Sequence, residues 1–442
     1  MKERILFVAS LVVLLTAGLF CALAVECVAS IPRVWRVNDD ALADFRTIQE
    51  AVDAAGVGDI IYVCNGTYSE DITVSKALSI IGESRDATIV RSSNVLSDVF
   101  TVTASDVLVV NLTIRDGICG VNALGQRVTV FSCKFSYNSI GSYLQGLNCS
   151  VLNSEFVRND VGINIFGSNS NVIMHNRIAQ NNWIGISLEY GSASNVVKFN
   201  EISSNGYSSL SPDILGGVFL FDSMDNTFLC NNFVDNAIQV KDHSDRIYAN
   251  LWSEAFPVGG NYWSDYVTKY PNASGIDDSG IWATPYVINK LNVDGNPLVN
   301  PIRGFDVVGL DGKQYVVTVT SNSTISGFRF DSGDKPSITF AVSGASGTTG
   351  SCGVTIPAGL LSAENGWHVA IDGETINCTS VSTEGFTYLH FGYDHNARVV
   401  VIKEEEVVPE FSFLTALLLL MAATTLAAAT RRRRRLNLRK AA

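Results

Sequence analysis

The sequence predicts an all-β protein: a right-handed parallel β-helix with an N-terminal cap helix, then a small antiparallel β-sandwich, then a C-terminal transmembrane helix. Three observations predict this order. A repeat of 21 to 31 residues runs through the middle of the chain, short strand-like segments without that period follow it, and an uncharged stretch of 20 residues stands near the C-terminus. A repeat of this length is typical of a solenoid, in which each unit buries its apolar face by stacking on the next.

Residues 1–30 have the pattern of a signal peptide. Lys2 and Arg4 give a positive start, residues 5–23 are almost wholly apolar, and the small residue Ala29 offers a cleavage position. An uncleaved membrane anchor is the alternative. Both place the residues that follow outside the cytoplasm.

The C-terminus predicts a membrane segment. Residues 411–430 carry no charge, and at a rise of about 1.5 Å per residue they span roughly 30 Å, one hydrocarbon core. A linker at 404–410 precedes them, and a basic tail at 431–442 follows, beginning with five arginines. Because arginine is costly to move across a bilayer, we expect a cytoplasmic tail and a body held at the cell surface.

The body between these ends is acidic. The whole chain carries a net charge of −12. The signal segment holds two basic and two acidic residues and the tail holds seven basic ones, which leaves 22 basic and 41 acidic residues, a net charge of −19, in residues 31–430. Such a body argues against nucleic acid and anionic lipid surfaces as partners. It suits a solvated surface protein.

The repeat consists of an apolar anchor with asparagine three residues later, except in the first unit, where glycine replaces the asparagine. Successive anchors are 21, 21, 22, 24 and 31 residues apart, and the long last interval holds an insertion around residues 207–212. We expect the asparagine to tolerate the left-handed backbone of a sharp bend and to bond with its counterpart in the next unit. The anchors are Ile114, Phe135, Phe156, Ile178, Ile202 and Phe233, and the residues three positions later are Gly117, Asn138, Asn159, Asn181, Asn205 and Asn236.

Two further columns keep this frame. Five residues before the anchors stand the apolar residues Val109, Val130, Val151, Ile173, Val197 and Phe228. Immediately before five of the anchors stand Lys134, Glu155, Arg177, Glu201 and Asn232. In a parallel stack these residues are nearest neighbours, and like charges there would repel. The alternating signs therefore indicate a structural role for the charges rather than a catalytic one.

A cap helix is expected at residues 44–56. Ile48, Ala51, Val52 and Ala55 have the spacing of one helical face, and Gly56 is a suitable C-terminal stop. Strands are expected next at 60–63, 72–74 and 78–81. A helix laid over the first coil would cover the open apolar end of the solenoid.

Several motifs at the two ends of the body point to one family. The segments FRTIQEAVDAA at 45–55, GDIIYV at 58–63, GTY at 66–68 and LSIIG at 78–82 open the body, and GNYWSDY at 260–266 and TPY at 284–286 close it. Together they resemble NosD-like and pectin-lyase-like right-handed β-helix proteins, including archaeal surface proteins. The resemblance covers about residues 36–302 and implies the fold of a β-helix domain at 31–302. It does not specify an activity.

The C-terminal segment carries a resemblance of its own. Pro409-Glu410-Phe411, the apolar stretch and the arginines that follow resemble an archaeal PEF-type sorting signal. That resemblance implies that the tail is cut off and the body is transferred to a lipid. An ordinary retained span is the alternative.

Residues 303–403 lack the repeat and predict an antiparallel β-sandwich. Strand-like segments stand at 315–320, 338–342, 352–356, 368–371, 387–391 and 398–402. Cys352 and Cys378 are the expected disulfide, because both lie in one small β domain of an exported chain. The other cysteines of the body are expected to be small buried apolar residues: Cys64, Cys119, Cys133, Cys149 and Cys230.

Two acidic sets are the candidates for catalysis. A polysaccharide lyase or glycoside hydrolase needs clustered carboxylates, about 5 to 10 Å apart for hydrolysis. Neither set matches a lyase or polygalacturonase motif, so surface solvation is the expected role and no catalytic residue is predicted. Three converging carboxylates in a groove beside residues 207–217 would contradict this expectation. The sets are Asp213, Asp222 and Asp225, and Asp235, Asp242 and Asp245.

Aromatic residues concentrate near the end of the β-helix. Exposed, they would stack on sugar rings as a carbohydrate site, and buried, they would close the last coil. The need to cover that end favours the cap. The candidate carbohydrate-binding residues are Trp252, Tyr262, Trp263, Tyr266, Trp282 and Tyr286.

No cofactor is expected, with calcium as the one candidate. Asp277, Asp278 and Asp294 offer oxygen ligands, although neither segment follows the twelve-residue calcium loop. The NosD resemblance implies a link to copper-site maturation, for which soft ligands would be needed. The body has only Met174 and Met224 as methionines and its histidines form no close cluster, which disfavours copper.

Glycosylation is permitted at six N-x-S/T sites, namely Asn65, Asn111, Asn148, Asn272, Asn322 and Asn377. Taken together, the sequence predicts a membrane-anchored surface protein, non-catalytic, whose β-helix contacts carbohydrate or other cell-envelope material. A polysaccharide-cleaving enzyme on the same fold is the first alternative. A purely structural envelope component is the second.

Overall fold

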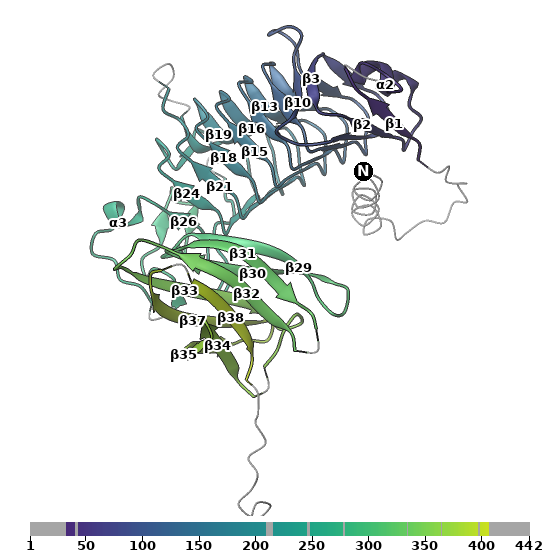
Figure 1. Cartoon of the computed structure of the whole chain (residues 1–442). Coiled ribbons are helices and arrows are strands. Elements are labelled where there is room, and N and C mark those ends of the chain that lie inside the picture. The colour runs from purple at the N-terminus through teal and green to yellow at the C-terminus, as the bar shows by residue number, and fades with distance from the viewer. Residues whose placement is uncertain are drawn as a thin grey trace, which may run out of the picture.

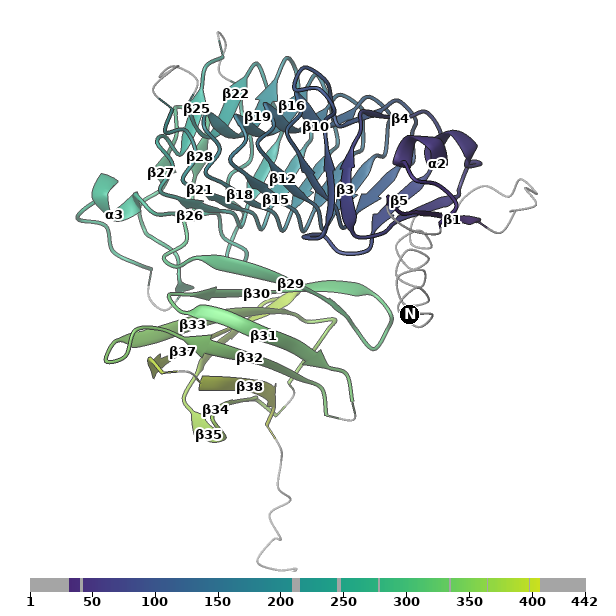
Figure 2. The same ribbon diagram turned by 45° about the horizontal axis from the view of Figure 1, so that its top comes forward.

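The computed structural model describes residues 32–39, 43–208, 215–244, 248–276, 279–333, 335–363, 365–396 and 398–405. The predicted signal peptide, transmembrane segment and basic tail lie outside these residues. Within the described residues, no helix has the length and apolar character needed to cross a membrane. The chain forms a parallel β-helix, and two antiparallel sheets lie beside its C-terminal coils (Figures 1 and 2).

Three parallel sheets, here named A, B and C in the order in which each coil meets them, form the sides of the β-helix. Sheet A contains β1 (Val34–Val37), β2 (Ile60–Val63), β5 (Ser79–Gly82), β8 (Leu108–Val110), β11 (Thr129–Phe131), β14 (Ser150–Leu152), β17 (Val172–Met174), β20 (Val196–Lys198) and β23 (Thr227–Leu229). Sheet B contains β3 (Gly66–Ser69), β6 (Thr88–Arg91), β9 (Thr113–Arg115), β12 (Lys134–Ser136), β15 (Glu155–Val157), β18 (Arg177–Ala179), β21 (Glu201–Ser203), β24 (Asn232–Val234) and β26 (Tyr262–Trp263). Sheet C contains β4 (Ile72–Val74), β7 (Phe100–Val102), β10 (Cys119–Ala123), β13 (Ile140–Leu144), β16 (Val161–Phe166), β19 (Ile184–Glu189), β22 (Gly216–Phe221) and β25 (Val240–Asp242).

The strand register confirms the columns that the repeat predicts. In sheet B, each anchor pairs with the next one from Ile114 to Phe233. In sheet A, the apolar column from Val109 to Phe228 pairs in the same way. Both columns point inward and are fully buried. The continuous apolar core along the axis therefore rests on residues that the spacing alone identifies.

The charged column of sheet B is also confirmed. Lys134, Glu155, Arg177 and Glu201 are successive neighbours in the register. The Arg177 guanidinium lies 2.7 Å from a Glu155 carboxylate oxygen and 3.7 Å from one of Glu201. These groups are partly exposed, so each pair contributes little to stability. Their main effect is to avoid repulsion between like charges in adjacent coils.

From Asp106 onward, the coils turn at three corners, and at each corner a left-handed residue precedes the inward-facing one. At the corner between sheets B and C the left-handed residues are Asp116, Tyr137, Arg158, Gln180, Ser204 and Asp235, with φ between 48° and 62°. The asparagines at the next position do not adopt this conformation. The prediction that asparagine itself takes the left-handed bend is therefore wrong. The bend turns the side chain of the next residue inward, and asparagine stands at that next position because its amide bonds to the neighbouring coils.

Asparagine ladders fill all three corners. The BC ladder consists of Asn138, Asn159, Asn181, Asn205 and Asn236, and each Nδ2 donates to the Oδ1 of the next member at 2.9 to 3.1 Å. The AB ladder consists of Asn176, Asn200, Asn231 and Asn261. The CA ladder consists of Asn171, Asn195, Asn226, Asn250 and Asn292. The same Oδ1 atoms accept the backbone N–H of the preceding member, so the ladders satisfy backbone groups that the corners leave unpaired.

The AB ladder ends on a carboxylate. Asp294 has no exposed surface, and its Oδ2 accepts the Asn261 backbone N–H and the Trp263 indole N–H, both at 2.8 Å. Its Oδ1 accepts the Asn296 backbone N–H at 3.1 Å. Burial raises the pKa of Asp294 to about 6, although these hydrogen bonds act in the opposite direction.

A short helix covers the first coil. Helix α2 (Ile48–Ala54) begins after Thr47, whose hydroxyl accepts the Glu50 N–H, and buries Ile48, Ala51 and Val52. It is shorter than the predicted 44–56 because Phe45 forms a bridge with Val37 and extends the sheet instead. At the other end, α3 (Tyr266–Lys269) and the short pair β27 (Tyr286–Val287) and β28 (Val293–Asp294) follow the last coil.

The C-terminal region contains two five-stranded antiparallel sheets that share one buried core. One sheet contains β29 (Ile302–Val308), β30 (Gln314–Ser321), β33 (Thr349–Pro357), β37 (Phe386–Asp394) and β36 (Thr379–Ser382). The other contains β31 (Thr324–Asp331), β32 (Ser337–Ser343), β38 (Arg398–Glu404), β34 (Trp367–Ile371) and β35 (Glu374–Ile376). All six strand-like segments of the sequence lie within these strands, whereas β29, β31, β35 and β36 have no counterpart among them.

The expected disulfide between Cys352 and Cys378 is wrong, because both thiols are free. Strand β37 lies between β33, which carries Cys352, and β36, which begins after Cys378. The register pairs Cys352 with Phe391 and Thr379 with His390. Two strand spacings, roughly 9.6 Å, therefore separate the two cysteines. A disulfide needs Cα atoms within about 7 Å.

Side chains of the β-helix contact the first strand of the sandwich. The Asn232 side chain donates to the Ile302 carbonyl and accepts the Ile302 N–H, both at 2.8 Å. The His175 Nε2 lies 3.3 Å from an Asp306 carboxylate oxygen, and the His175 ring stacks on Phe199. These contacts attach β29 to the outer surface of sheets A and B.

We predict that Asn181→Ala lowers the free energy of unfolding by roughly 3 kcal/mol, because it removes the buried oxygen that accepts the backbone N–H and the side-chain amide of Asn159, and the amide that donates to Asn205. Urea denaturation followed by circular dichroism measures the loss. Asn182→Ala is the matched control, since Asn182 is exposed and its side-chain amide donates to the Asp160 carboxylate. The control should change stability by less than about 0.5 kcal/mol. Equal effects of the two variants would contradict a structural role for the ladder.

Asp294 predicts a pH dependence of stability. An unfolded aspartate loses its proton near pH 4, whereas the folded Asp294 holds its proton up to about pH 6. The folded state therefore binds a proton that the unfolded state has lost, and stability should fall by about 3 kcal/mol as the pH rises through this window. Thermal unfolding of wild type and Asp294→Asn at pH 4.5, 5.5 and 7 measures the difference. A slope that is identical in the variant would contradict the assignment.

Candidate functional site

The aromatic residues at the end of the β-helix continue its inner columns. Trp263 pairs with the anchor Phe233 in sheet B, and their rings stack at 4.3 Å. Tyr286 stacks on Trp263 at 4.0 Å, and Trp252 stacks on Phe228 at 4.3 Å. The buried indole N–H groups donate to the last members of the CA and AB ladders. These rings therefore form an extension of the core.

The predicted carbohydrate surface at these aromatics is wrong for most of the set. Trp252, Trp263, Tyr266 and Tyr286 are each at most 4% exposed, so a sugar ring has no access to them. Tyr262 and Trp282 are half-buried, and Trp282 stacks on Tyr266 at 4.7 Å. The alternative expectation, that these residues close the last coil, matches the structure.

Of the six acidic candidates, the four that the structure describes each have a place in a turn or in a hydrogen bond. Asp213 and Asp245 lie outside the described residues. Asp222, Asp225 and Asp235 occupy left-handed positions with φ of 48° to 54°, which aspartate tolerates better than most residues. Asp242 accepts the Asn289 amide at 2.9 Å. Turn geometry, which the sequence does not display directly, therefore explains most of these carboxylates.

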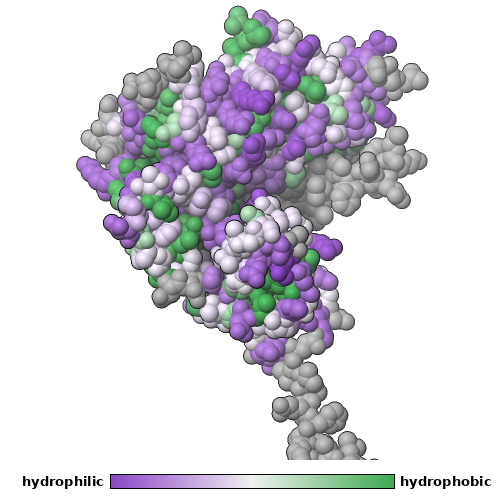
Figure 3. Space-filling view, turned by 60° about the vertical axis from the view of Figure 1, so that its left-hand side comes forward, coloured by the Kyte–Doolittle hydropathy of each residue, from purple (hydrophilic) through white to green (hydrophobic). Residues whose placement is uncertain are grey.

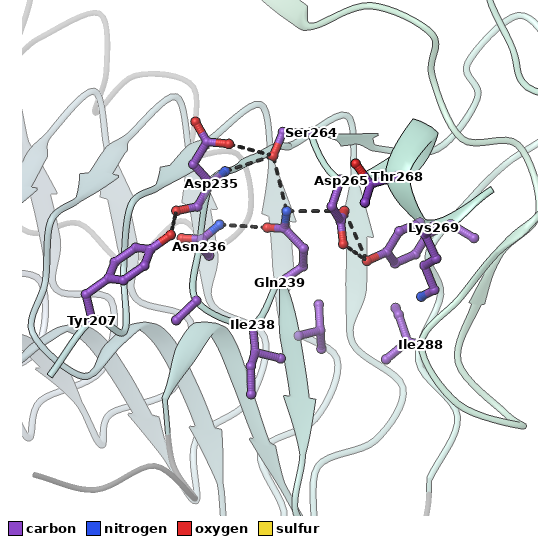
Figure 4. Close-up of a pocket in the computed structure, with 13 residues that line it drawn as sticks. Tyr207, Asp235, Asn236, Ile238, Gln239, Ser264, Asp265, Thr268, Lys269 and Ile288 are labelled. Carbon is purple, nitrogen blue, oxygen red and sulfur yellow. Dashed lines mark hydrogen bonds between the residues drawn. The ribbon is translucent and has the colours of Figure 1, made fainter. Parts of the chain in front are cut away.

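A cleft of about 730 Å³ lies beside the last coil (Figure 4). Three segments line the cleft: the last coil, α3 with the residues just before it, and the chain beyond α3. The lining residues are Ala237, Ile238, Gln239 and Val240 in the first segment, Ser264, Asp265, Thr268 and Lys269 in the second, and Tyr286 and Ile288 in the third. Tyr207, at the edge of the insertion, also lines it and is 66% exposed. The cleft thus exists because the chain leaves the solenoid at Ser264 and folds back over the last coil.

A hydrogen-bond network crosses the cleft. The Gln239 side chain accepts the amide of Asn236, the last BC ladder residue, at 2.9 Å, and donates to Ser264 and Asp265, each at 3.3 Å. The Tyr286 hydroxyl donates to Asp265 at 3.0 Å. Burial and the negative charge of Asp265 raise the pKa of Tyr286, which keeps this hydroxyl a donor. The ladder therefore fixes the polar wall of the cleft.

Two carboxylates and one ammonium face this space. Asp235 accepts from the Ser264 hydroxyl at 3.2 Å, and Asp265 is held by Tyr286 and Gln239. The Lys269 ammonium donates to the Val287 carbonyl at 2.7 Å and lies 3.8 Å from the centre of the Tyr286 ring. Such a set can bind sugar hydroxyl groups. Of these residues, the sequence analysis singled out only Asp235 and Tyr286 as candidates. Ser264 and Asp265 belong to the GNYWSDY motif, so the motif was the sequence signal that could have identified them.

The calcium candidates are not brought together. Asp277 and Asp278 lie outside the described residues. Both oxygens of Asp294 are occupied by protein donors in the AB ladder, which explains this carboxylate without a metal. In the part of the chain that the structure describes, no three His, Cys, Asp or Glu side chains form a metal-ligating group.

Copper does not fit the described side chains either. The β-helix cysteines are buried, and burial raises the pKa of Cys133 and of Cys230 to about 12, so these thiols stay protonated. His175 is engaged with Asp306 and Phe199. The soft, clustered ligands that copper prefers are therefore not assembled among these residues.

The glycosylation sites differ in access. Asn111 is partly buried, and its amide donates to the Gly82 carbonyl at 2.9 Å. A glycan there would break this bond. The other five sites are exposed: Asn65, Asn148, Asn272, Asn322 and Asn377.

The solved structures that the chain resembles include polysaccharide lyases and pectin methylesterases, all at low similarity. An alginate lyase from Paenibacillus sp. str. FPU-7 is 14% identical with a TM-score of 0.40, covering 49% of this chain and 94% of that one. Pectate lyase Pel9A is 16% identical with a TM-score of 0.36, covering 57% and 87%. A pectin methylesterase from Aspergillus niger is 16% identical with a TM-score of 0.35, covering 50% and 85%. No curated protein matches the chain.

One family model matches the chain, over residues 53–268, and its description is "Periplasmic copper-binding protein (NosD)". These residues span most of the β-helix, from the cap helix to α3. The registered coils and the closing GNYWSDY segment lie within or directly beside the match. Over these residues the β-helix of this chain therefore matches the NosD-like family of parallel β-helices.

Proposed function

We propose that this chain is an exported, membrane-anchored surface protein whose β-helix binds carbohydrate of the cell envelope without cleaving it. The cleft beside the last coil is the observation that carries the proposal. Its wall presents the hydroxyl or amide groups of Gln239, Ser264 and Thr268, and Tyr207 places an exposed aromatic ring at its edge. Hydroxyl-rich ligands match these groups.

The location rests on the sequence and on the family. An apolar start with two basic residues, and an uncharged C-terminal stretch followed by five arginines, are typical of an exported chain with one anchor. The matching family is described as periplasmic, which supports a body outside the cytoplasm. The visible face of the β-helix is largely hydrophilic, as a solvated surface protein requires (Figure 3).

The carboxylates of the cleft favour binding over hydrolysis. Asp265 is held by the Tyr286 hydroxyl and the Gln239 amide, and Asp235 accepts from Ser264. Both carboxylates thus accept hydrogen bonds from side chains of the cleft wall. A glycoside hydrolase would need two carboxylates placed on either side of the glycosidic bond, whereas these two hold the wall together.

We predict that Ala237→Trp weakens polysaccharide binding at least tenfold, because the exposed Ala237 lines the cleft and an indole there would fill it. The assay is affinity electrophoresis of the full chain, in a detergent without a sugar headgroup, against a panel of soluble polysaccharides. Ala87→Trp is the matched control, since Ala87 is an exposed alanine in an early coil. Binding by no polysaccharide would contradict the function and favour a purely structural component, and release of new reducing ends would favour a hydrolase.

We predict that ending the chain after Glu406 releases the body from the membrane. The change removes the uncharged stretch and the arginines while keeping every strand of the sandwich. Fractionation of cells into membrane and soluble fractions, followed by immunoblotting, measures the result. Retention of the truncated chain on membranes would contradict anchoring through the C-terminus.

A further inference from the structure

Four aromatic rings form a row on the outer side of sheet C. They are Tyr143 of β13, Phe166 of β16, Tyr190 immediately after β19 and Phe221 of β22. Successive ring centroids are 5.9, 4.6 and 5.2 Å apart. The rings come from four successive coils, so the row, here called the aromatic track, runs along the axis of the β-helix.

The track is a surface feature rather than part of the core. Tyr190 is 58% exposed, and the other three rings are half-buried. Tyr190 also adopts a left-handed backbone with φ of 53°, which is unfavourable for a bulky residue. The preceding coil has Gly167 at the equivalent position, with φ of 55°. An exposed tyrosine thus occupies a left-handed position that glycine would adopt at a lower cost in free energy.

A buried polar atom beside the track lacks a partner. Asn164 lies between Tyr143 and Ser187 in the register of sheet C and is only 9% exposed. Its Nδ2 donates to Glu189 at 3.2 Å, and the Ser187 hydroxyl donates to the same oxygen at 2.6 Å. The Asn164 Oδ1 has no hydrogen-bond partner in the described structure. A buried acceptor without a partner is costly, and a donor from a ligand would satisfy it.

The charges around the track disfavour an acidic ligand. Glu189 pairs in register with Phe166 and Phe221, and Asp222 follows Phe221 directly. Lys241, which pairs with Phe219, is the nearby cation of the last strand. The body as a whole carries an excess of acidic groups. A polyuronate would therefore be repelled, whereas a neutral chain would not.

We propose that the aromatic track binds a linear neutral polysaccharide that lies along the axis across several coils. The apolar faces of its sugar rings stack on the four side chains, and its hydroxyl groups donate to Asn164 and Glu189. Coils rise by roughly 4.8 Å, so an extended chain of sugars meets one ring from each of four successive coils. This inference rests on the proposed carbohydrate function but assigns it a second site, separate from the cleft.

The test replaces one ring at a time in the full chain, again in a detergent without a sugar headgroup. Tyr190→Gly removes the most exposed ring and relieves the left-handed strain, so the fold is preserved. Tyr137→Gly is the matched control, since Tyr137 is also an exposed left-handed tyrosine, with φ of 59°, but lies at the BC corner. Asn164→Leu removes the unpartnered acceptor. Thermal unfolding reports the integrity of each variant.

The probes are xyloglucan, galactomannan and amylose, with polygalacturonate as the anionic comparison. We expect Tyr190→Gly to weaken binding of at least one neutral polysaccharide about tenfold, as the loss of one stacking ring implies, and Tyr137→Gly to leave it within twofold. If Tyr190→Gly binds with unchanged affinity while Ala237→Trp no longer binds, the aromatic track is not a binding site and the proposed function of the cleft still holds. Failure of the wild type to bind any polysaccharide would overturn both. Preferred binding of polygalacturonate would overturn the assignment of a neutral ligand.

Discussion

Each coil of the β-helix must turn three times, and each turn leaves inward-facing backbone groups that only the neighbouring coil can satisfy. The asparagine ladders meet this requirement at all three corners. Because every ladder amide bonds to its neighbours along the axis, the corners stay aligned, and the aligned corners hold the apolar columns of sheets A and B in register. The stability of the core in these coils and the polar wall of the cleft both depend on this alignment.

The sequence was sufficient for the register of the β-helix but not for its corners. The anchors from Ile114 to Phe233 were identified because spacing and residue type vary together, and the BC ladder followed from them. The AB and CA ladders follow the same period, with Asn176 and Asn171 each two residues before an apolar inward residue. They were missed because an asparagine near an apolar residue does not by itself indicate a corner. The left-handed residue that precedes it would identify the corner, and such residues are of many types.

The candidate site shows the same division. Trp263 and Tyr286 are conspicuous in the sequence, yet they belong to the core, because the last coil has no successor to cover it. The cleft depends on where the chain leaves the solenoid, and the aromatic track depends on which faces of sheet C point outward. Both are properties of long-range register. Tyr143, Phe166 and Tyr190 stand 23 and 24 residues apart in an otherwise unremarkable stretch, so composition alone did not distinguish them.

All three ladders run in one sense, with the N–H groups of one coil directed at an oxygen of the next. Only the final coil therefore needs a residue that ends the series, and Gln239, Asn292 and Asp294 serve there. The coils between the two ends are interchangeable units. Duplication of one coil that precedes His175 would lengthen the solenoid and add another row to each outer face, without any change to the cap helix, the closing segment or the attached sandwich. The length of the outer faces of the solenoid can thus evolve independently of its ends.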